Sequence, residues 1–419
     1  MKDLMNLCWK RYRLFIGAVC ILILGVQLYS ARTFVNEWDL SYQWLNSSQF
    51  VDDIAWQMAD VPEDAPLRFF QMQDEASSFE RQFGDEVSLA NIRTFRLSLR
   101  KDAPEWNLTG FTELFPQGSN GVTTQGTSFG TYGVFIIFGT MLVGFLFFYL
   151  DTRTRFIQFL FSSRFKRLDI LQAKILLLFA PLSLAFIISQ IIKYLIIFNR
   201  IPSPYMNIGF SDVLPSLIFN TLYLVALLSF GAFFGVIMGQ VATGIFSMIG
   251  FALFIIYGMG GASQLYFILN RPFENNRTFS LLNGIVVNYL DVAIGNGLPV
   301  SYITVILISL VFLGIVFYAY PKLSLENTGE YLLLPQLRRL TLALTIVGST
   351  FIGWTVPMQE ARWEANGRWV ELSVAESLTS SLRTAIIAPI LMGLLIYFFI
   401  YGKKGLQKIQ NLRIKKTNI

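Results

Sequence analysis

The sequence predicts an all-α membrane protein that crosses the bilayer about eight times. Hydrophobic residues make up 54% of the chain and charged residues only 14%, whereas a soluble domain carries about 25% charged residues. Apolar runs long enough to span a bilayer, which takes about 20 residues, recur along the whole sequence. One long polar stretch, residues 31–131, separates the first two runs and supplies the single sizeable water-soluble domain.

Eight apolar segments meet the length requirement for a membrane-spanning helix. They are residues 14–30, 132–150, 175–198, 213–238, 243–268, 301–320, 340–357 and 384–401. The first segment lacks the small-residue cleavage site that ends a signal peptide, so we expect it to be retained as a span.

Basic residues orient these spans, because loops rich in Lys and Arg stay in the cytoplasm. The four segments 1–13, 151–174, 321–339 and 403–419 together contain 19 of the chain's 33 Lys and Arg residues. Eight spans with both termini inside place all four segments in the cytoplasm. The net charge of +6 therefore reflects a basic inner face beside anionic membrane lipids, and it does not indicate a nucleic-acid partner.

The polar segment 31–131 then lies outside the membrane. It carries 15 Asp and Glu against 7 Lys and Arg, and it is long enough for a small domain. We expect a mixed α/β or mainly helical fold, and the partial alternation of apolar and polar residues in 86–99 favours a strand there. The acidic surface is interpreted as a soluble face kept away from anionic lipid; attraction of cationic substrates is the alternative.

Several kinds of chemistry are excluded by residues that the chain lacks. It contains no histidine, which removes His-based nucleophilic catalysis, His-ligated zinc and His proton relays. No Gly-x-x-x-x-Gly-Lys-Ser/Thr motif occurs, so the chain has no phosphate-binding loop of its own. We expect no catalytic residues, no metal site and no cofactor in this chain. Lys193, the one clear charge inside a span, is expected to snorkel to the lipid headgroups.

The segment 151–174 carries the strongest functional signal. Six Lys or Arg residues stand there against two Asp, and they are interleaved with aromatic residues. Some of its apolar residues fall at helical spacing, so we expect a helix that lies on the membrane or against a partner. If the chain is a transporter, this basic, aromatic loop between two spans is the place where a separate energy-supplying protein would act on it.

The order of these segments resembles the membrane subunit of bacterial ABC-2 type exporters, of a Gram-positive-like subgroup with a large extracellular domain. The loop SSRFKRLDILQAK at 162–174 and the acidic turn LENTGEY at 325–331 are similar to patterns of that family. The resemblance implies a cytoplasmic coupling helix near 153–165 that contacts a separate ATP-binding subunit, which binds ATP and magnesium. The implied coupling residues are Arg153, Arg155, Phe156, Phe159, Leu160, Phe161 and Arg164.

The resemblance also implies a domain order. Residues 1–30 form the N-terminal tail and first span, 31–131 the extracellular domain, and 132–339 the core with an outer re-entrant segment near 270–300. Residues 340–402 add a pair of spans seen in some members, and 403–419 form a basic cytoplasmic tail. The chain is then a multi-pass protein of the bacterial plasma membrane, paired with a second membrane subunit that is identical or homologous.

In such exporters a path at the subunit interface conducts an amphipathic substrate, such as a peptide, lipid or drug. The polar and small residues that we expect to line it are Thr140, Gly144, Ser183, Ser189, Gln190, Thr243, Ser247 and Gly250. The same residue types also serve helix packing in membranes. Two other functions stay open: a membrane sensor or regulator with an acidic extracellular sensing domain, and a membrane enzyme acting on lipids through Asp212, Asp291, Glu360 or Glu364.

Overall fold

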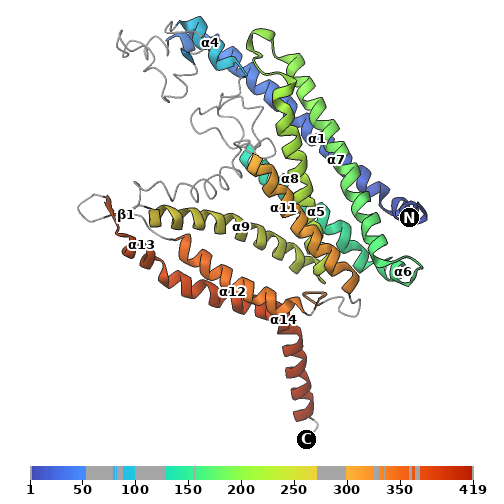
Figure 1. Cartoon of the computed structure of the whole chain (residues 1–419). Helices are drawn as coiled ribbons and strands as arrows, with labels where there is room; N and C mark the ends of the chain where they lie inside the picture. The colour runs from blue at the N-terminus through green and yellow to red at the C-terminus, as the bar shows by residue number, and fades with distance from the viewer. Residues whose placement is uncertain are drawn as a thin grey trace. The chain divides into compact units, whose positions relative to one another are not determined.

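A computed structural model describes most of the chain. The described residues are 2–52, 79–80, 82, 88–99, 129–154, 156–270, 299–323, 330–334, 336–357, 361–363 and 369–417. In this part the chain is mostly helical, in agreement with the predicted fold class (Figure 1). The helices are α1 (Lys2–Leu45), α4 (Leu89–Leu97), α5 (Phe129–Arg153), α6 (Phe156–Ser162), α7 (Arg167–Arg200), η3 (Ser203–Tyr205), α8 (Phe210–Ile237), α9 (Val241–Asn270), α11 (Pro299–Ala319), η6 (Tyr320–Lys322), α12 (Leu337–Thr355), α13 (Val374–Ser380) and α14 (Leu382–Thr417). Two short strands, β1 (Ala361–Trp363) and β2 (Trp369–Glu371), pair antiparallel before α13.

Each predicted span falls on a helix, but fewer than eight of these helices meet the criteria for crossing a membrane. Among the described residues, five do so by length and apolar composition. They are Asp3–Leu45, Arg167–Arg200, Phe210–Ile237, Val305–Lys322 and Val374–Tyr401. The pair Ile136–Asp151 and Phe156–Ser162 makes a sixth if a bend of 61° is allowed within one span, and α9 contributes the shorter apolar helix Val241–Phe254. The described part of the chain therefore has five helices, or six with the bent pair, that are suited to cross a membrane, as in a multi-pass membrane protein.

Several helices are longer than the apolar runs that revealed them. The helix α1 continues from the first predicted span to Leu45 without a break, and α7 begins at Arg167 rather than at the apolar residue 175. Hydropathy detects only the part of a helix that lipid can cover. The flanking turns are helical because their own side chains pack, as Val35, Trp38 and Leu45 do along one face of α1.

The chain divides into two compact units. One consists of Met1–Cys8, Ile137–Leu176 and Val225–Ile419, and the other of Trp9–Ile136 and Leu177–Leu224. We call them the coupling unit and the outer-segment unit, because the first contains α6, the predicted coupling helix, and the second contains α4 of the predicted extracellular segment. The long helices α1, α5, α7 and α8 contribute to both units.

The outer-segment unit has a core made by the polar segment's own helix. Buried Ile92, Phe95 and Leu97 of α4 belong to one hydrophobic cluster with residues of α1, α7 and α8. The indole N–H of Trp38 donates to the Leu97 carbonyl at 3.0 Å. The backbone N–H of Leu99 donates to the carbonyl of Tyr205, which belongs to η3. This part of the predicted extracellular domain is therefore fastened to the ends of spanning helices.

The prediction of a strand within 86–99 is wrong. Ser88 caps α4 by accepting a hydrogen bond from the Asn91 backbone N–H, and Leu89, Ile92 and Phe95 then recur at helical spacing. The apolar residues appeared to alternate because those near the two ends of this helical stripe also lie two positions apart in the sequence. Most of the rest of the predicted extracellular segment, and residues 271–298 of the predicted re-entrant region, lie outside the described residues.

In the coupling unit, α5 and α8 approach closely through glycines. A Cβ atom at Gly144 would lie 2.5 Å from the Leu228 carbonyl oxygen, and one at Gly231 would overlap the backbone of Met141. Small residues at such a crossing let two helix backbones meet, which is the main source of packing between helices in lipid. The contact fixes α5 against α8 over several turns.

The last two long helices pack against the core of the same unit. Figure 1 shows α12 and α14 side by side, with α9 next to them. The ring of Phe254 from α9 packs against Gly348 of α12. Gly353 of α12 packs against the backbone of α14, where a Cβ atom on Gly353 would lie 2.7 Å from the Thr384 carbonyl oxygen. The added helix pair is therefore part of the packed unit.

Residues 330–334, which we call the strap, connect the α12–α14 pair to the turn between α8 and α9. The backbone N–H groups of Gly239 and Leu333 donate to the carbonyls of Tyr331 and Ile237 respectively. The Tyr331 hydroxyl lies 2.7 Å from that of Ser247, and its ring stacks on Phe399 of α14. Burial raises the pKa of the Tyr331 hydroxyl, while the hydrogen bond to Ser247 lowers it. The phenol therefore stays protonated and able to donate at neutral pH.

Gly231→Ala is expected to destabilise the protein, because the new methyl group overlaps the α5 backbone. Overpacking of this kind costs about 1–3 kcal/mol, so the thermal unfolding midpoint in detergent should fall. Gly139→Ala is the matched control, since nothing lies within 4 Å of a Cβ atom at that α5 position. Equal midpoints for the two variants would contradict the close contact between α5 and α8.

Tyr331→Phe should lower stability by about 1 kcal/mol, the usual net contribution of one hydrogen bond. Its ring still stacks on Phe399, whereas Tyr331→Ala also loses that contact and should cost about 3–5 kcal/mol. The thermal midpoints of both variants, measured beside wild type, check this order. A Tyr331→Ala protein as stable as Tyr331→Phe would show that the ring does not hold the strap.

Candidate functional site

The segment predicted to couple to a partner is a short helix between two bent junctions. The helix α5 ends at Arg153, and the Thr154 hydroxyl donates to the Leu150 carbonyl at 2.9 Å. The chain then bends by 61° into α6. After Ser162 the hydroxyl of Ser163 donates back to the Leu160 carbonyl at 2.6 Å. The Leu150 and Leu160 carbonyls each also accept the backbone N–H of the same residue, Thr154 and Ser163 respectively, so both junctions are closed by paired local hydrogen bonds.

One face of α6 is buried in the coupling unit. Ile157 and Leu160 have almost no exposed surface. Phe161 meets the ring of Tyr320 edge-on, at 5.7 Å between ring centroids. The guanidinium of Arg167 lies over its ring at 4.4 Å from the centroid. Leu160 and Phe161 were expected to touch a partner, but they instead hold α6 on its own chain.

The opposite face of α6 is not covered by other described residues. Phe159 has 56% of its surface exposed and stacks with Phe156 at 6.1 Å between ring centroids. Its neighbour Gln158 is exposed as well. Phe156 is half-buried, so the pair presents one exposed ring supported by a second ring. An aromatic side chain exposed on a helix whose other face is anchored is a candidate anchor for a partner.

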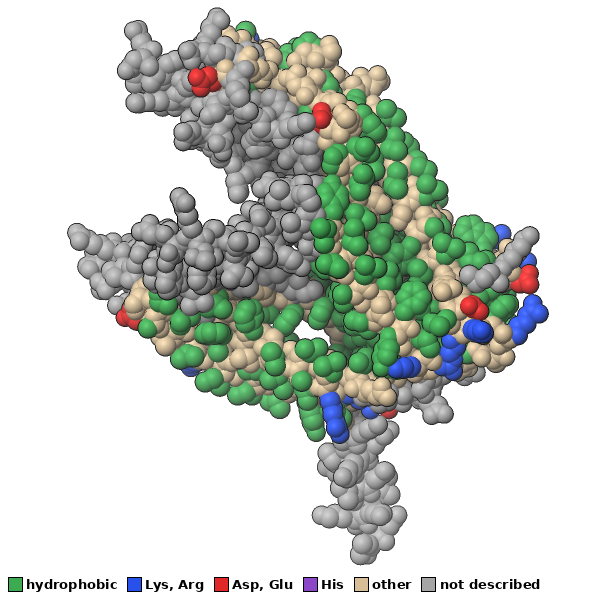
Figure 2. All heavy atoms as spheres, in the orientation of Figure 1, with side chains coloured by type: hydrophobic (Ala, Val, Ile, Leu, Met, Phe, Trp, Pro, Cys, Tyr) green, Lys and Arg blue, Asp and Glu red, His purple; other side chains and the backbone are tan. Residues whose placement is uncertain are grey.

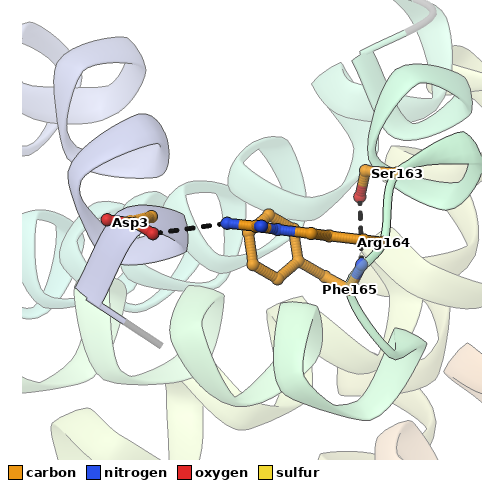
Figure 3. Close-up of polar contacts among 4 residues, drawn as sticks. All are labelled: Asp3, Ser163, Arg164 and Phe165. Carbon is orange, nitrogen blue, oxygen red and sulfur yellow. Dashed lines mark hydrogen bonds and ion pairs between the residues drawn. The ribbon is translucent and has the colours of Figure 1, made fainter.

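Basic side chains flank this aromatic pair. Arg164 lies over the ring of Phe165, and its guanidinium is 3.5 Å from the Asp3 carboxylate (Figure 3). Both partners of that ion pair are more than three-quarters exposed, so it contributes little. Lys166 is exposed too, and Figure 2 shows blue side chains gathered over α6 and the turn that follows it. We call Phe156, Phe159, Arg164 and Lys166 the α6 surface.

Arg167 differs from Arg164 and Lys166 because it binds backbone carbonyls of its own chain. Its guanidinium donates to the carbonyls of Pro321 at 2.6 Å and Leu323 at 3.3 Å. These carbonyls stand at the end of α11, where η6 leaves few backbone partners for them. The first residue of α7 is thereby tied to the end of α11.

Behind the α6 surface lies a buried ion pair. The Lys174 ammonium is 2.6 Å from the Asp151 carboxylate, and neither side chain has any exposed surface. The ammonium also lies over the ring of Phe148, at 4.6 Å from its centroid, and 5.6 Å from that of Phe147. Removing either partner would leave a buried charge without its counterion, which is far more costly than the pair itself is stabilising.

Of the predicted coupling residues, Phe156, Phe159 and Arg164 belong to the α6 surface. Arg153 is the last residue of α5, but its side chain lies outside the described atoms, as does the whole of Arg155. Sequence reasoning missed the Asp151–Lys174 pair. The available signal was a pair of opposite charges at the ends of two apolar runs on either side of one short loop.

The residues predicted to line a path fall in both units. In the coupling unit, Thr140 and Gly144 lie on α5, and Thr243, Ser247 and Gly250 on α9. Gly144 packs against α8 and Ser247 bonds Tyr331, so both serve internal contacts. Thr243 is 3.4 Å from the Gln240 carbonyl, and Gly250 faces open space.

In the outer-segment unit, the predicted residues Ser183, Ser189 and Gln190 lie on α7. The Ser189 hydroxyl donates to the Phe186 carbonyl. The Gln190 side-chain oxygen is buried and has no hydrogen-bond partner among the described residues, and the same holds for Asn220 of α8, which sequence reasoning did not single out. Lys193 is only 5% exposed, so it does not snorkel as expected.

The comparisons with known proteins add no relative. No family model matches the chain, and neither a curated protein nor a solved structure is significantly similar to it. Across the ranges that the structure describes, no three His, Cys, Asp or Glu side chains group as metal ligands do. The function must therefore be argued from the α6 surface and the contacts beneath it.

Proposed function

We propose that this chain is the permease subunit of an ATP-driven exporter of the ABC-2 type. The exposure of Phe159 on a short helix whose other face is anchored carries the proposal. A partner that binds there contacts a helix that is fixed to the coupling unit, because Leu160 and Phe161 pack the other face of α6 against it. The flanking Arg164 and Lys166 favour a partner whose contact surface is acidic.

The partner in this proposal is a separate ATP-binding subunit, which binds ATP and magnesium and supplies the hydrolysis. The chain itself catalyses nothing: it conducts the substrate and receives the partner's motion at α6. A second membrane subunit, identical or homologous, completes the path. Both termini lie in the cytoplasm of a bacterial cell, where the basic inner face meets anionic lipids.

The substrate class proposed is amphipathic: a peptide, a lipid or a drug. Few charges stand within the spans, and buried polar oxygens such as those of Gln190 and Asn220 are placed among apolar residues. A polar group buried without a partner is costly, so a passing polar group or water that bonds it relieves that cost. Such sites suit a substrate with separate polar and apolar parts.

The deciding experiment is purification of the tagged chain from its native membrane in mild detergent. A stoichiometric soluble partner with a phosphate-binding loop, together with vanadate-sensitive ATP hydrolysis, supports the exporter. A chain that emerges alone under several extraction conditions, with no ATPase activity, favours the membrane sensor with an acidic extracellular domain.

Phe159→Glu is expected to abolish recovery of the ATP-binding partner, because it removes the exposed ring and places a negative charge on a surface that favours an acidic partner. Gln158→Glu is the matched control, since it adds the same charge at the next exposed position without loss of a ring. The amount of partner in the purified complex is the readout. Full recovery of partner with Phe159→Glu would refute the assignment of the α6 surface.

Phe161→Glu is not a docking test, although Phe161 is one of the implied coupling residues. Its ring is sandwiched between Tyr320 and Arg167, so this variant should lower the unfolding midpoint as well as partner recovery. A drop in partner recovery without any loss of stability would mean that Phe161 also reaches the partner.

A further inference from the structure

We propose that the Asp151–Lys174 ion pair is a clamp that makes α5 and α7 move as one body at their α6 ends. The two residues are positioning residues: neither is expected to touch substrate or partner. The inference deepens the proposed function and rests on it where transport is concerned. The clamp itself is a property of the chain alone.

The first argument is the location of the pair. Asp151 lies one turn before the Thr154 break at which α5 ends, and Lys174 lies two turns into α7. Everything between them is the α6 hairpin. A force applied at Phe159 reaches α5 and α7 through these two helix ends, so a bond between the ends makes the two helices respond together.

The second argument is the cost of separation. Both side chains are completely buried at 2.6 Å, and a buried charge that loses its counterion is strongly destabilising. If α7 slid along α5 by one turn, about 5.4 Å, the two charges would separate and each would be left buried among phenyl rings. Apolar contacts alone would tolerate such sliding far better, because they are non-directional.

The third argument is that both clamped ends are themselves held. Lys174 also lies over the rings of Phe147 and Phe148, so together with Asp151 three side chains of α5 contact its ammonium. The backbone of α5 is locked to α8 at Gly144 and Gly231. At the other end, Arg167 ties α7 to the end of α11. The ion pair is a direct connection between these two fixed sets of helices.

The test measures the α5–α7 distance directly. Leu150 and Leu176 are exposed positions on α5 and α7, 42% and 53% exposed, and each is replaced by Cys in a Cys8→Ser, Cys20→Ser background and spin-labelled. The distance distribution is compared for wild type, for Asp151→Leu with Lys174→Met, and for the charge swap Asp151→Lys with Lys174→Asp. The apolar double variant leaves no unpaired buried charge, so it is expected to fold.

The clamp predicts one narrow distance peak in wild type, loss of that peak in the apolar double variant and its return in the charge swap. Asp3→Ala, which removes only the exposed ion pair to Arg164, should keep the narrow peak. An unchanged narrow peak in the apolar double variant would overturn the clamp. If that variant fails to fold, a broad distribution in the folded charge swap would overturn it instead.

The same variants separate the clamp from the proposed function. In the complex with its ATP-binding partner, the apolar double variant should retain the partner yet lose substrate-stimulated ATP hydrolysis. Retained stimulation would refute a role in transmission. If wild type recovers no partner at all, the proposed function fails, while the distance measurement still decides whether the clamp exists.

Discussion

The carboxylate of Asp151 and the ammonium of Lys174 impose a constraint that the architecture of the coupling unit must respect. Two charges withdrawn from water at 2.6 Å favour the register between α5 and α7 in which they meet, because separating them would leave each charge buried without its counterion. That register fixes where α6 leaves one helix and enters the next. In that register Leu160 is buried and Phe159 is exposed. The glycine contacts of α5 with α8 and the Arg167 tie to α11 extend the same constraint across the unit.

The bilayer explains why the fold class could be predicted from the sequence. In lipid each backbone polar group must be satisfied within its own segment, so long apolar runs become helices. All eight predicted segments lie on helices for this reason. Hydropathy could not predict that α1 continues to Leu45, because that part of the helix is stabilised by packing of Val35 and Trp38. It also could not resolve α4, where a nine-residue helix resembled an alternating strand.

The candidate site was predictable in its location and less so in its detail. Charge and aromatic content marked the loop 151–174, but α6 has only seven residues, too few to reveal which face is buried. Phe159 and Leu160 are adjacent apolar residues with opposite exposure, and only tertiary contacts distinguish them. The Asp151–Lys174 ion pair depends on how α5 and α7 meet, which a single sequence does not specify.

Site-specific photo-crosslinking at position 159 tests the central claim most directly. A benzophenone amino acid placed there in the full chain is irradiated in native membranes, and the adduct is identified by mass spectrometry. The account predicts one dominant adduct with a soluble protein that carries a phosphate-binding loop. Adducts with lipid alone, or with no protein in repeated preparations, would contradict the assignment of α6 as the coupling element.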